Sequence, residues 1–452
     1  MTWVFLAVLA ATIATTLIFR KDIFSPGRVY LSIYSLLLAI NSLHLSRVQV
    51  PWCFYTRIFF WGACFMFLGG CVLAGLAAKA KFPRWRFDFA AVKQAISMDA
   101  AALDWSWFRT VWLACTGIFL ASYLTSYFVI GELPILSSSP EQSRLAFNSA
   151  TGPSYYGLYF GPFSLMLGLE MILFAGLSRR GLLAVAGIFG MVMVLYLTII
   201  TRFDIFRFVI FGTVLFHYGK KNLRFSHLAL VFIAILVVFF SASLIRINED
   251  AMGALTETIK VKLPRNLAWA SGFYAYLAND FWNMNYGFQK FAEGNYHHPL
   301  SMGLGMMRAI TGYLLNIEFG LISTFGYDTV MNPKVELVSG LNTVVYVWHI
   351  WKDFGKVGVF LVPFIGGLLL SNFHLNSLMR PTLFRMSMWG CLVAIVILSF
   401  HFPIWELWFF HVNLLVLAVA HRKLTLLGSK RVAAPIPPGN ATMPSSPGLS
   451  LP

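Results

Sequence analysis

Charged side chains are scarce in this 452-residue chain, which has 18 Asp and Glu against 34 Lys and Arg. They make up only 12% of the residues, where a typical soluble domain has about 25%. Hydrophobic residues make up 58%, and the mean hydropathy is +0.72. This balance excludes a soluble globular enzyme. It also excludes a disordered chain, because so much apolar surface does not stay solvated.

Cysteine and the common cofactor motifs are sparse as well. The five cysteines lie in or beside apolar runs without CxxC spacing, which is typical of small buried hydrophobic residues. No HExxH, Asp-x-Asp or Walker A motif is present, so neither a metal nor a nucleotide cofactor is expected. Asp353-Phe354-Gly355 matches a kinase tripeptide, but no glycine-rich loop or His-Arg-Asp accompanies it.

Long hydrophobic runs dominate the sequence instead. A helix of about 20 apolar residues crosses a bilayer, and about eleven runs approach that length. They predict an all-α integral membrane protein. The predicted spans are Thr2–Phe19, Val29–Leu45, Phe59–Ala78, Phe108–Ile130, Tyr156–Leu177, Leu182–Thr201, Ile205–Tyr218, His227–Leu244, Val357–Phe373, Met386–Phe400 and Ile404–Ala420.

Basic residues gather in alternate turns between these runs, as at Lys79 and Lys81 and again at Lys220 and Lys221. The positive-inside rule places these turns in the cytoplasm, the N-terminus outside and the C-terminus inside. The net charge of +16 follows from these loops, so no nucleic-acid partner is expected. The first run lacks a preceding basic residue, which favours an anchor over a cleaved signal peptide.

This topology predicts three parts and a tail. An N-terminal bundle of about eight spans covers 1–245, and C-terminal spans, about three, cover 343–421. The segment 246–342 between them carries nearly balanced charge and many aromatic residues, which favours one large extracytoplasmic loop of short amphipathic helices lying on the membrane. The Pro- and Ser-rich segment 432–452 is expected to be a disordered cytoplasmic tail.

Arginines on the outer side are the first candidates for a binding site. Arg202 and Arg207 flank Asp204 at an outer turn, and two fixed cations there would suit the diphosphate of a lipid-linked sugar. The alternative is an Arg-Asp-Arg clasp that ties two helices together, and the sequence leaves both open. Further outer cations are Arg144, Arg246 and Arg308.

Several buried polar residues have structural interpretations. Glu170 lies within a predicted span and must face the bundle interior, because a carboxyl group in lipid is costly. Asp353 is expected to cap the helix that follows it, and Gly355, Gly358, Gly366 and Gly367 would permit close helix approach. Candidate proton acceptors are His297, His298, His349 and His401.

Five short motifs occur in a recognisable order along most of the chain, to about residue 420. They are Phe24-Ser25-Pro26, Gly131-x-x-Pro134 followed by Arg144, Thr201-Arg202, Leu244-Ile245-Arg246, and Asn342-Thr343 to Asp353-Phe354-Gly355-x-x-Gly358. In order and spacing the chain resembles the bacterial oligosaccharide repeat unit polymerases, the Wzy-type O-antigen and exopolysaccharide polymerases. One departure is Phe203, since similar proteins often have a small residue after the arginine.

The resemblance implies a glycosyltransferase C-like membrane fold in the bacterial inner membrane, with polymerisation on its outer face. A growing glycan on undecaprenyl diphosphate would pass to the non-reducing end of a lipid-linked repeat unit, without a metal or cofactor. The implied partners are this lipid-linked donor and acceptor and membrane lipid, and a chain-length regulator is left open.

The chemistry needs cations for the departing diphosphate and a base for the acceptor hydroxyl. We assign Arg202, Arg207, Arg246, Arg144 and Arg308 to the diphosphate, and the base to His298, His297 or Asp280.

Two rival functions remain open at this point. An O-antigen ligase shares the architecture and the lipid substrate but moves a finished glycan to lipid A. A flippase of the same pathway would need a polar route through the bundle.

Overall fold

The computed structural model is helical throughout the residues that it describes, with no strand among them. Five of these helical segments are long and apolar enough to cross a membrane: α3 (Phe54–Lys81), α5 (Trp105–Ile130), Tyr156–Phe174, which contains α8 (Phe160–Phe174), α9 (Arg179–Thr198) and α17 (Tyr346–Met379). The described residues are 3–8, 10, 22–83, 87–149, 156–199, 203–224, 226–227, 230, 268–294, 343–401 and 408–422.

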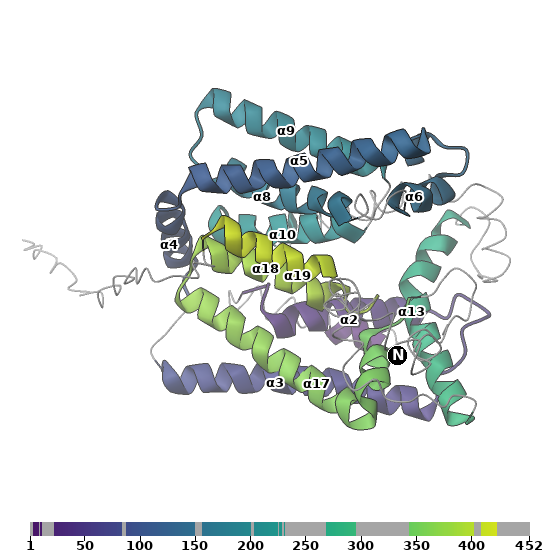
Figure 1. The fold of residues 1–452 in the computed structure, drawn as a ribbon. Helices are drawn as coiled ribbons and strands as arrows, with labels where there is room; N and C mark the ends of the chain where they lie inside the picture. The colour runs from purple at the N-terminus through teal and green to yellow at the C-terminus, as the bar shows by residue number, and fades with distance from the viewer. Residues whose placement is uncertain are drawn as a thin grey trace, which may run out of the picture.

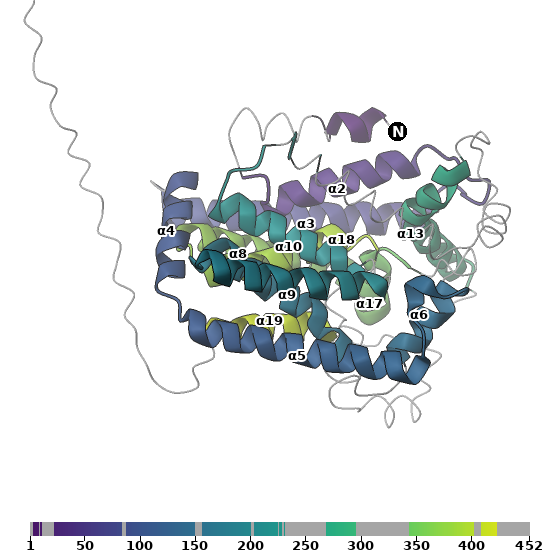
Figure 2. The ribbon, with the colours of Figure 1, turned by 90° about the horizontal axis from the view of Figure 1, so that it is seen from above.

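The long helices run roughly parallel to one another (Figure 1), together with the shorter α2 (Pro26–Asn41), α10 (Phe203–Gly219), α18 (Leu383–Leu398) and α19 (Trp408–Ala420). Helix α4 (Phe89–Ala101) crosses one end of this bundle, and α6 (Pro140–Ser149) and α13 (Ala268–Ala292) lie at the other. The view from above shows the same two ends (Figure 2). We call them the α4 end and the α13 end.

Basic turns of the chain meet at the α4 end. Lys220, just after α10, lies close enough to Lys93 of α4 for the two charges to interact. Arg422, after α19, pairs with Asp104 at 3.0 Å. Helix α3 also ends there, with Lys79 and Lys81 in its last turn. The basic turns that the sequence placed on one side therefore share this end.

Three helices begin three residues before the apolar runs that predicted them. Asp104 accepts hydrogen bonds from the backbone N–H groups of the first turn of α5. Ser178 and Thr382 cap α9 and α18 in the same way. A capping side chain satisfies orphan N–H groups before the apolar stretch starts, so hydropathy alone places these starts too late.

Helix α17 is much longer than the predicted span Val357–Phe373, and it is interrupted. Gly355 has φ 65° and ψ −157°, which breaks the helix between a first part from Tyr346 and a long second part. Such a positive φ is strained for residues with a side chain. Asp353 is buried just before the break, near the place expected for a residue that caps the following segment.

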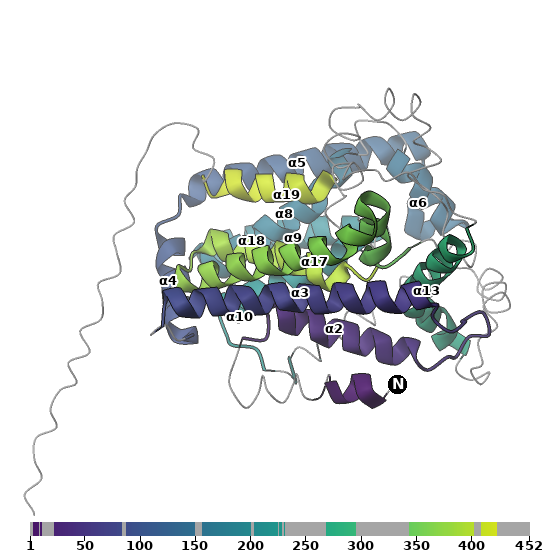
Figure 3. The ribbon, with the colours of Figure 1, turned by 90° about the horizontal axis from the view of Figure 1, so that it is seen from below.

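Helices α3 and α17 lie side by side along most of their length (Figure 3). Gly70 and Gly367 face the partner helix so closely that a Cβ at either position would run into its backbone. Gly367 thus has the close-approach role expected from the sequence. Gly366, by contrast, has open space around it.

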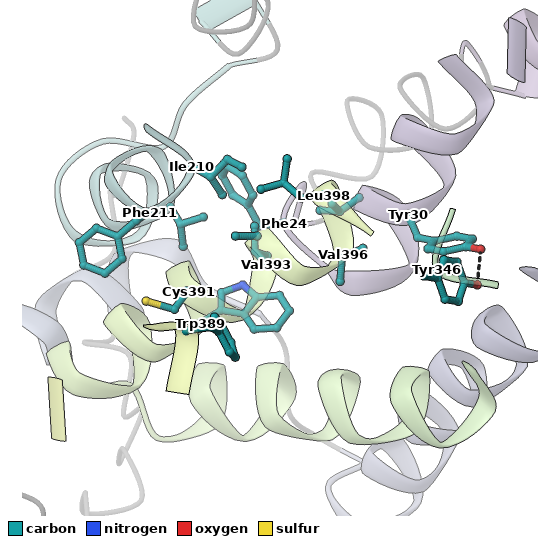
Figure 4. Close-up of a cluster of buried hydrophobic side chains, with 14 of the residues drawn as sticks. Phe24, Tyr30, Ile210, Phe211, Tyr346, Trp389, Cys391, Val393, Val396 and Leu398 are labelled. Atoms are coloured by element: carbon teal, nitrogen blue, oxygen red, sulfur yellow. Dashed lines mark hydrogen bonds between the residues drawn. The ribbon is translucent and has the colours of Figure 1, made fainter. Parts of the chain in front are cut away.

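The core of the bundle is built around α18. Its buried Trp389, Val393 and Val396 belong to one hydrophobic cluster with Phe24 and Phe211 (Figure 4). The short α18 is therefore surrounded by protein, which explains how a helix of 16 residues holds the longer ones together.

The described part of the segment 246–342 is one helix of 25 residues, α13, where the sequence favoured several short ones. Phe281 and Phe288 are fully buried against α3 and α17, in ring contacts with Phe60 and Trp348. Packing on the bundle stabilises a long helix here more than its own sequence pattern does. The predicted spans Thr2–Phe19 and His227–Leu244 and the tail 432–452 lie largely or wholly outside the described residues.

We expect Gly367→Leu to force α3 and α17 apart, because the added side chain meets the backbone of Phe67. Overpacking in a close interface costs about 1–3 kcal/mol or more. The yield of folded protein in membranes and its unfolding temperature should both fall. Gly366→Leu is the matched control and should leave both unchanged. Equal behaviour of the two variants would contradict this interface.

Candidate functional site

Three of the residues proposed from the sequence lie in the described part of the chain, and all three are at or near the α13 end. Asp280 is in α13, Arg207 is one turn into α10, and Arg144 is in α6. The other five proposed residues lie outside the described residues: His297, His298, Arg202, Arg246 and Arg308.

Asp280 forms a buried pair with His401. Asp280 has no solvent exposure, and His401 retains 7%. The carboxyl Oδ2 lies 3.1 Å from the imidazole Nδ1. The two residues come from α13 and from the turn that follows α18, so the pair joins elements that are far apart in the sequence.

Local structure holds both partners in place. His401 donates its backbone N–H to Leu398 at 3.0 Å, which turns the chain at the end of α18. Asn283, about one turn after Asp280, donates to the backbone oxygen of Thr343 at 3.0 Å. Asn285 accepts hydrogen bonds from Cys53 and from the Thr56 hydroxyl. These two asparagines thus fix α13 to its neighbours from different sides of the helix.

The environment of the pair defines its chemistry. Burial raises the pKa of the Asp280 carboxyl, and His401 and the Thr343 hydroxyl oppose that rise. When the carboxyl is ionised it can only accept, so Nδ1 of His401 carries the proton and Nε2 carries the lone pair. This tautomer gives the histidine the arrangement of a general base oriented by a carboxylate.

Hydrogen bonds between hydroxyl groups connect the helices next to the pair. Ser399, two residues before His401, hydrogen-bonds to Tyr34 at 3.0 Å and accepts the backbone N–H of Tyr346 at the same distance. The hydroxyls of Tyr346 and Tyr30 are 3.0 Å apart (Figure 4). These contacts tie the end of α18 to α2 and α17, and so they fix the position of His401.

Arg207 belongs to a second buried cluster. Its Nη1 donates to Asp204 Oδ1 at 3.0 Å, and the Tyr196 hydroxyl donates to Oδ2 at 2.7 Å. The guanidinium carbon lies 4.9 Å from the ring centre of Phe409, and the Arg207 side chain is 2% exposed. The cluster ties α9, α10 and α19 together. This geometry favours the clasp over a solvent-facing diphosphate contact for Arg207.

The two clusters share one connection. His401 contacts Asp280, and Phe409, eight residues later, contacts Arg207. An extended chain covers at most about 3.5 Å per residue, so the clusters lie within about 28 Å of each other along this connection. His401, just after α18, thus belongs to one cluster, and Phe409, in the first turn of α19, belongs to the other.

Arg144 is the partly exposed one of the two proposed arginines that the structure describes. It lies in α6, whose Phe147 is buried against Tyr123 of α5. With α6 anchored in this way, Arg144 lies at the α13 end in a partly exposed position.

Sequence reasoning named His401 as a proton acceptor but did not pair it with Asp280, because 121 residues separate them. Glu170 faces the interior as expected, and it meets His421 at 2.9 Å. The sequence did not predict the contact of Tyr196 with Asp204, because no local pattern indicates that this tyrosine donates a hydrogen bond there.

Within the described ranges, no three His, Cys, Asp or Glu side chains are arranged to hold a metal ion. Comparison with family models, with curated proteins and with solved structures finds no match to this chain.

If Arg207 is a clasp, Arg207→Met should leave the Asp204 carboxyl buried without its cation. Removing one partner of a buried pair costs about 3–5 kcal/mol, so the unfolding temperature should fall sharply. The double variant Asp204→Asn/Arg207→Met removes both charges and should recover much of that loss. A single variant as stable as the native protein would contradict the clasp.

Proposed function

We propose that this protein joins lipid-linked glycans at the α13 end of its bundle, as an oligosaccharide repeat unit polymerase of the outer face of the bacterial inner membrane. The observation that supports this best is the buried Asp280–His401 pair, a carboxylate-oriented histidine at the end opposite the basic turns. The resemblance in motif order supplies the substrate class, and the pair supplies a means of activating a hydroxyl group.

The proposed topology follows from charge. Cytoplasmic loops carry the excess of Lys and Arg, so the α4 end faces the cytoplasm and the α13 end faces outward. In the proposal about eleven spans cross the membrane, with the N-terminus outside and the C-terminus inside. A flipped lipid-linked substrate then reaches the α13 end from the outer leaflet.

In the proposed reaction His401 Nε2 accepts the proton of the acceptor sugar hydroxyl. The acceptor O–H bond breaks, its oxygen forms a bond to the anomeric carbon of the donor glycan, and the bond from that carbon to the diphosphate breaks. The diphosphate leaves with the electron pair, as undecaprenyl diphosphate. Asp280 is a positioning residue that orients the ring and stabilises the imidazolium as it forms.

Cations are needed where the diphosphate departs. Among the described residues, Arg144 is partly exposed whereas the Arg207 side chain is only 2% exposed, so Arg144 suits this role better. We propose Arg144 together with Arg202, Arg246 and Arg308, and we assign Arg207 to holding the helices that surround the site. His297 and His298 remain alternative bases.

The two rival functions differ in the phenotype of a deletion. Single repeat units on the final carrier indicate a lost polymerase, and an undecorated carrier indicates a lost ligase. Build-up of lipid-linked units on the cytoplasmic side indicates a lost flippase. Only the first outcome agrees with the proposal.

His401→Asn should abolish elongation of a synthetic lipid-linked repeat unit by purified protein, while binding of that unit stays intact. The amide retains a donor near the position of Nδ1 but cannot accept the proton, and general-base catalysis contributes roughly 10²- to 10⁴-fold. The control His44→Asn changes an exposed histidine that follows α2.

The control variant should elongate normally. Normal elongation by His401→Asn would remove His401 from the reaction, and loss of substrate binding would assign it a binding role instead.

A further inference from the structure

A second buried acid–histidine cluster lies at the α4 end, opposite the proposed site. Asp22 precedes α2, His217 and Tyr218 end α10, and His374 is in the second half of α17. All four side chains are buried. The proposed glycan transfer uses none of them.

The Asp22 carboxyl is surrounded by hydrogen-bond donors. Oδ1 accepts the backbone N–H of Phe24 at 2.9 Å. Oδ2 accepts the hydroxyl of Tyr218 and lies 2.6 Å from Nε2 of His374. The Tyr218 hydroxyl is itself 3.2 Å from that nitrogen. One short contact between a carboxyl and an imidazole thus lies where the segment before α2 meets α10 and α17.

His217 completes the cluster in a defined tautomer. Its Nδ1 accepts the backbone N–H of Leu223 at 3.1 Å, so the neutral ring carries its proton on Nε2. That N–H lies 3.9 Å from Asp22 Oδ1 and has no hydrogen-bond partner. A protonated Nε2 cannot ligate a metal, so the two histidines and the carboxyl do not form a metal site.

The other groups around the cluster are mostly uncharged. Phe89 of α4 packs edge-on against His217, and Trp389 of α18 lies against His374. Arg28 of α2 is the nearby cation, with Nη1 3.4 Å from the backbone oxygen of Asp22. Lys220 follows Tyr218 by two residues. Its ammonium group lies over the ring of Phe174 and interacts with the charge of Lys93 in α4.

We propose that this cluster is a proton-binding site. A proton held between His374 Nε2 and Asp22 Oδ2 stabilises the packing of α2, α10 and α17 against one another. With the proton bound, the contact is a charge-assisted pair of imidazolium and carboxylate. Without it, the buried carboxylate keeps only neutral donors and the more distant Arg28. The packing of these three helices is therefore more stable at low pH and less stable as the pH rises.

In this contact Asp22 is the ionised partner, and His374 is the donor. Burial alone would raise the pKa of Asp22, but His374, His217 and Tyr218 together outweigh it and lower that pKa. The carboxyl is therefore ionised, and a proton bound between the two groups lies on Nε2 of His374, 2.6 Å from Asp22 Oδ2. His217 stays neutral, because protonation of Nδ1 would break its bond to Leu223.

The test uses the full-length protein in lipid nanodiscs, with the unfolding temperature measured from pH 5.5 to 8.5. The native protein should unfold at lower temperature as the pH rises across this range. His374→Gln should remove that dependence, while His217→Gln should keep it. His227→Gln, at a half-buried histidine outside the cluster, is the control and should also keep it.

A flat profile for the native protein, or an unchanged slope in His374→Gln, would overturn the proposal. Tyr218→Phe provides a gentler second test if His374→Gln does not fold. Loss of the hydroxyl makes the carboxylate depend more on the proton, so the pH dependence should become steeper. A shallower or unchanged slope in Tyr218→Phe would contradict the assigned role.

Discussion

Buried carboxyl groups that are paired with histidines across the bundle organise this membrane protein. A carboxylate in an apolar interior is stable only with a partner, and loss of one partner is costly. Asp22 meets His374, Glu170 meets His421, and Asp280 meets His401. Each pair joins segments far apart in the chain, so the pairs select one arrangement of helices among the many that apolar packing alone would permit.

These pairs divide the molecule into two ends with different chemistry. The pairs of Asp22 and Glu170 lie towards the α4 end, where basic turns gather. The pair of Asp280 lies at the α13 end, and the Ser399 hydroxyl two residues before His401 bonds to Tyr34. In our proposals the pair at the α13 end activates a hydroxyl group, and the cluster at the α4 end holds a proton.

Much of the helical architecture follows from local patterns in the sequence. Apolar runs located α3, α5 and α9 because lipid-exposed helices need continuous hydrophobic surface. Helix starts were placed late where Asp104 or Ser178 caps the first turn. The length of α13 was missed, because its stability comes from packing on α3 and α17.

The site was predicted only in part, for a related reason. Asp280 and His401 were each recognised as groups that exchange protons, yet their pairing depends on the fold and leaves no trace in local spacing. The Arg207–Asp204 pair is an i, i+3 contact within one helix, and it is one half of the Arg-Asp-Arg clasp that the sequence left open, since Arg202 lies outside the described residues. Tyr196 and Phe409 complete that cluster from other helices and carry no local signal.

The central claim is that Asp280 and His401 act as one unit in glycan transfer. A double-mutant cycle tests this most directly, with elongation of a lipid-linked repeat unit measured for Asp280→Asn, His401→Asn and the combined variant. Residues that act as a unit are strongly non-additive. The account predicts that the combined variant is no slower than His401→Asn alone. Losses that multiply would show that the two residues act independently and would contradict the account.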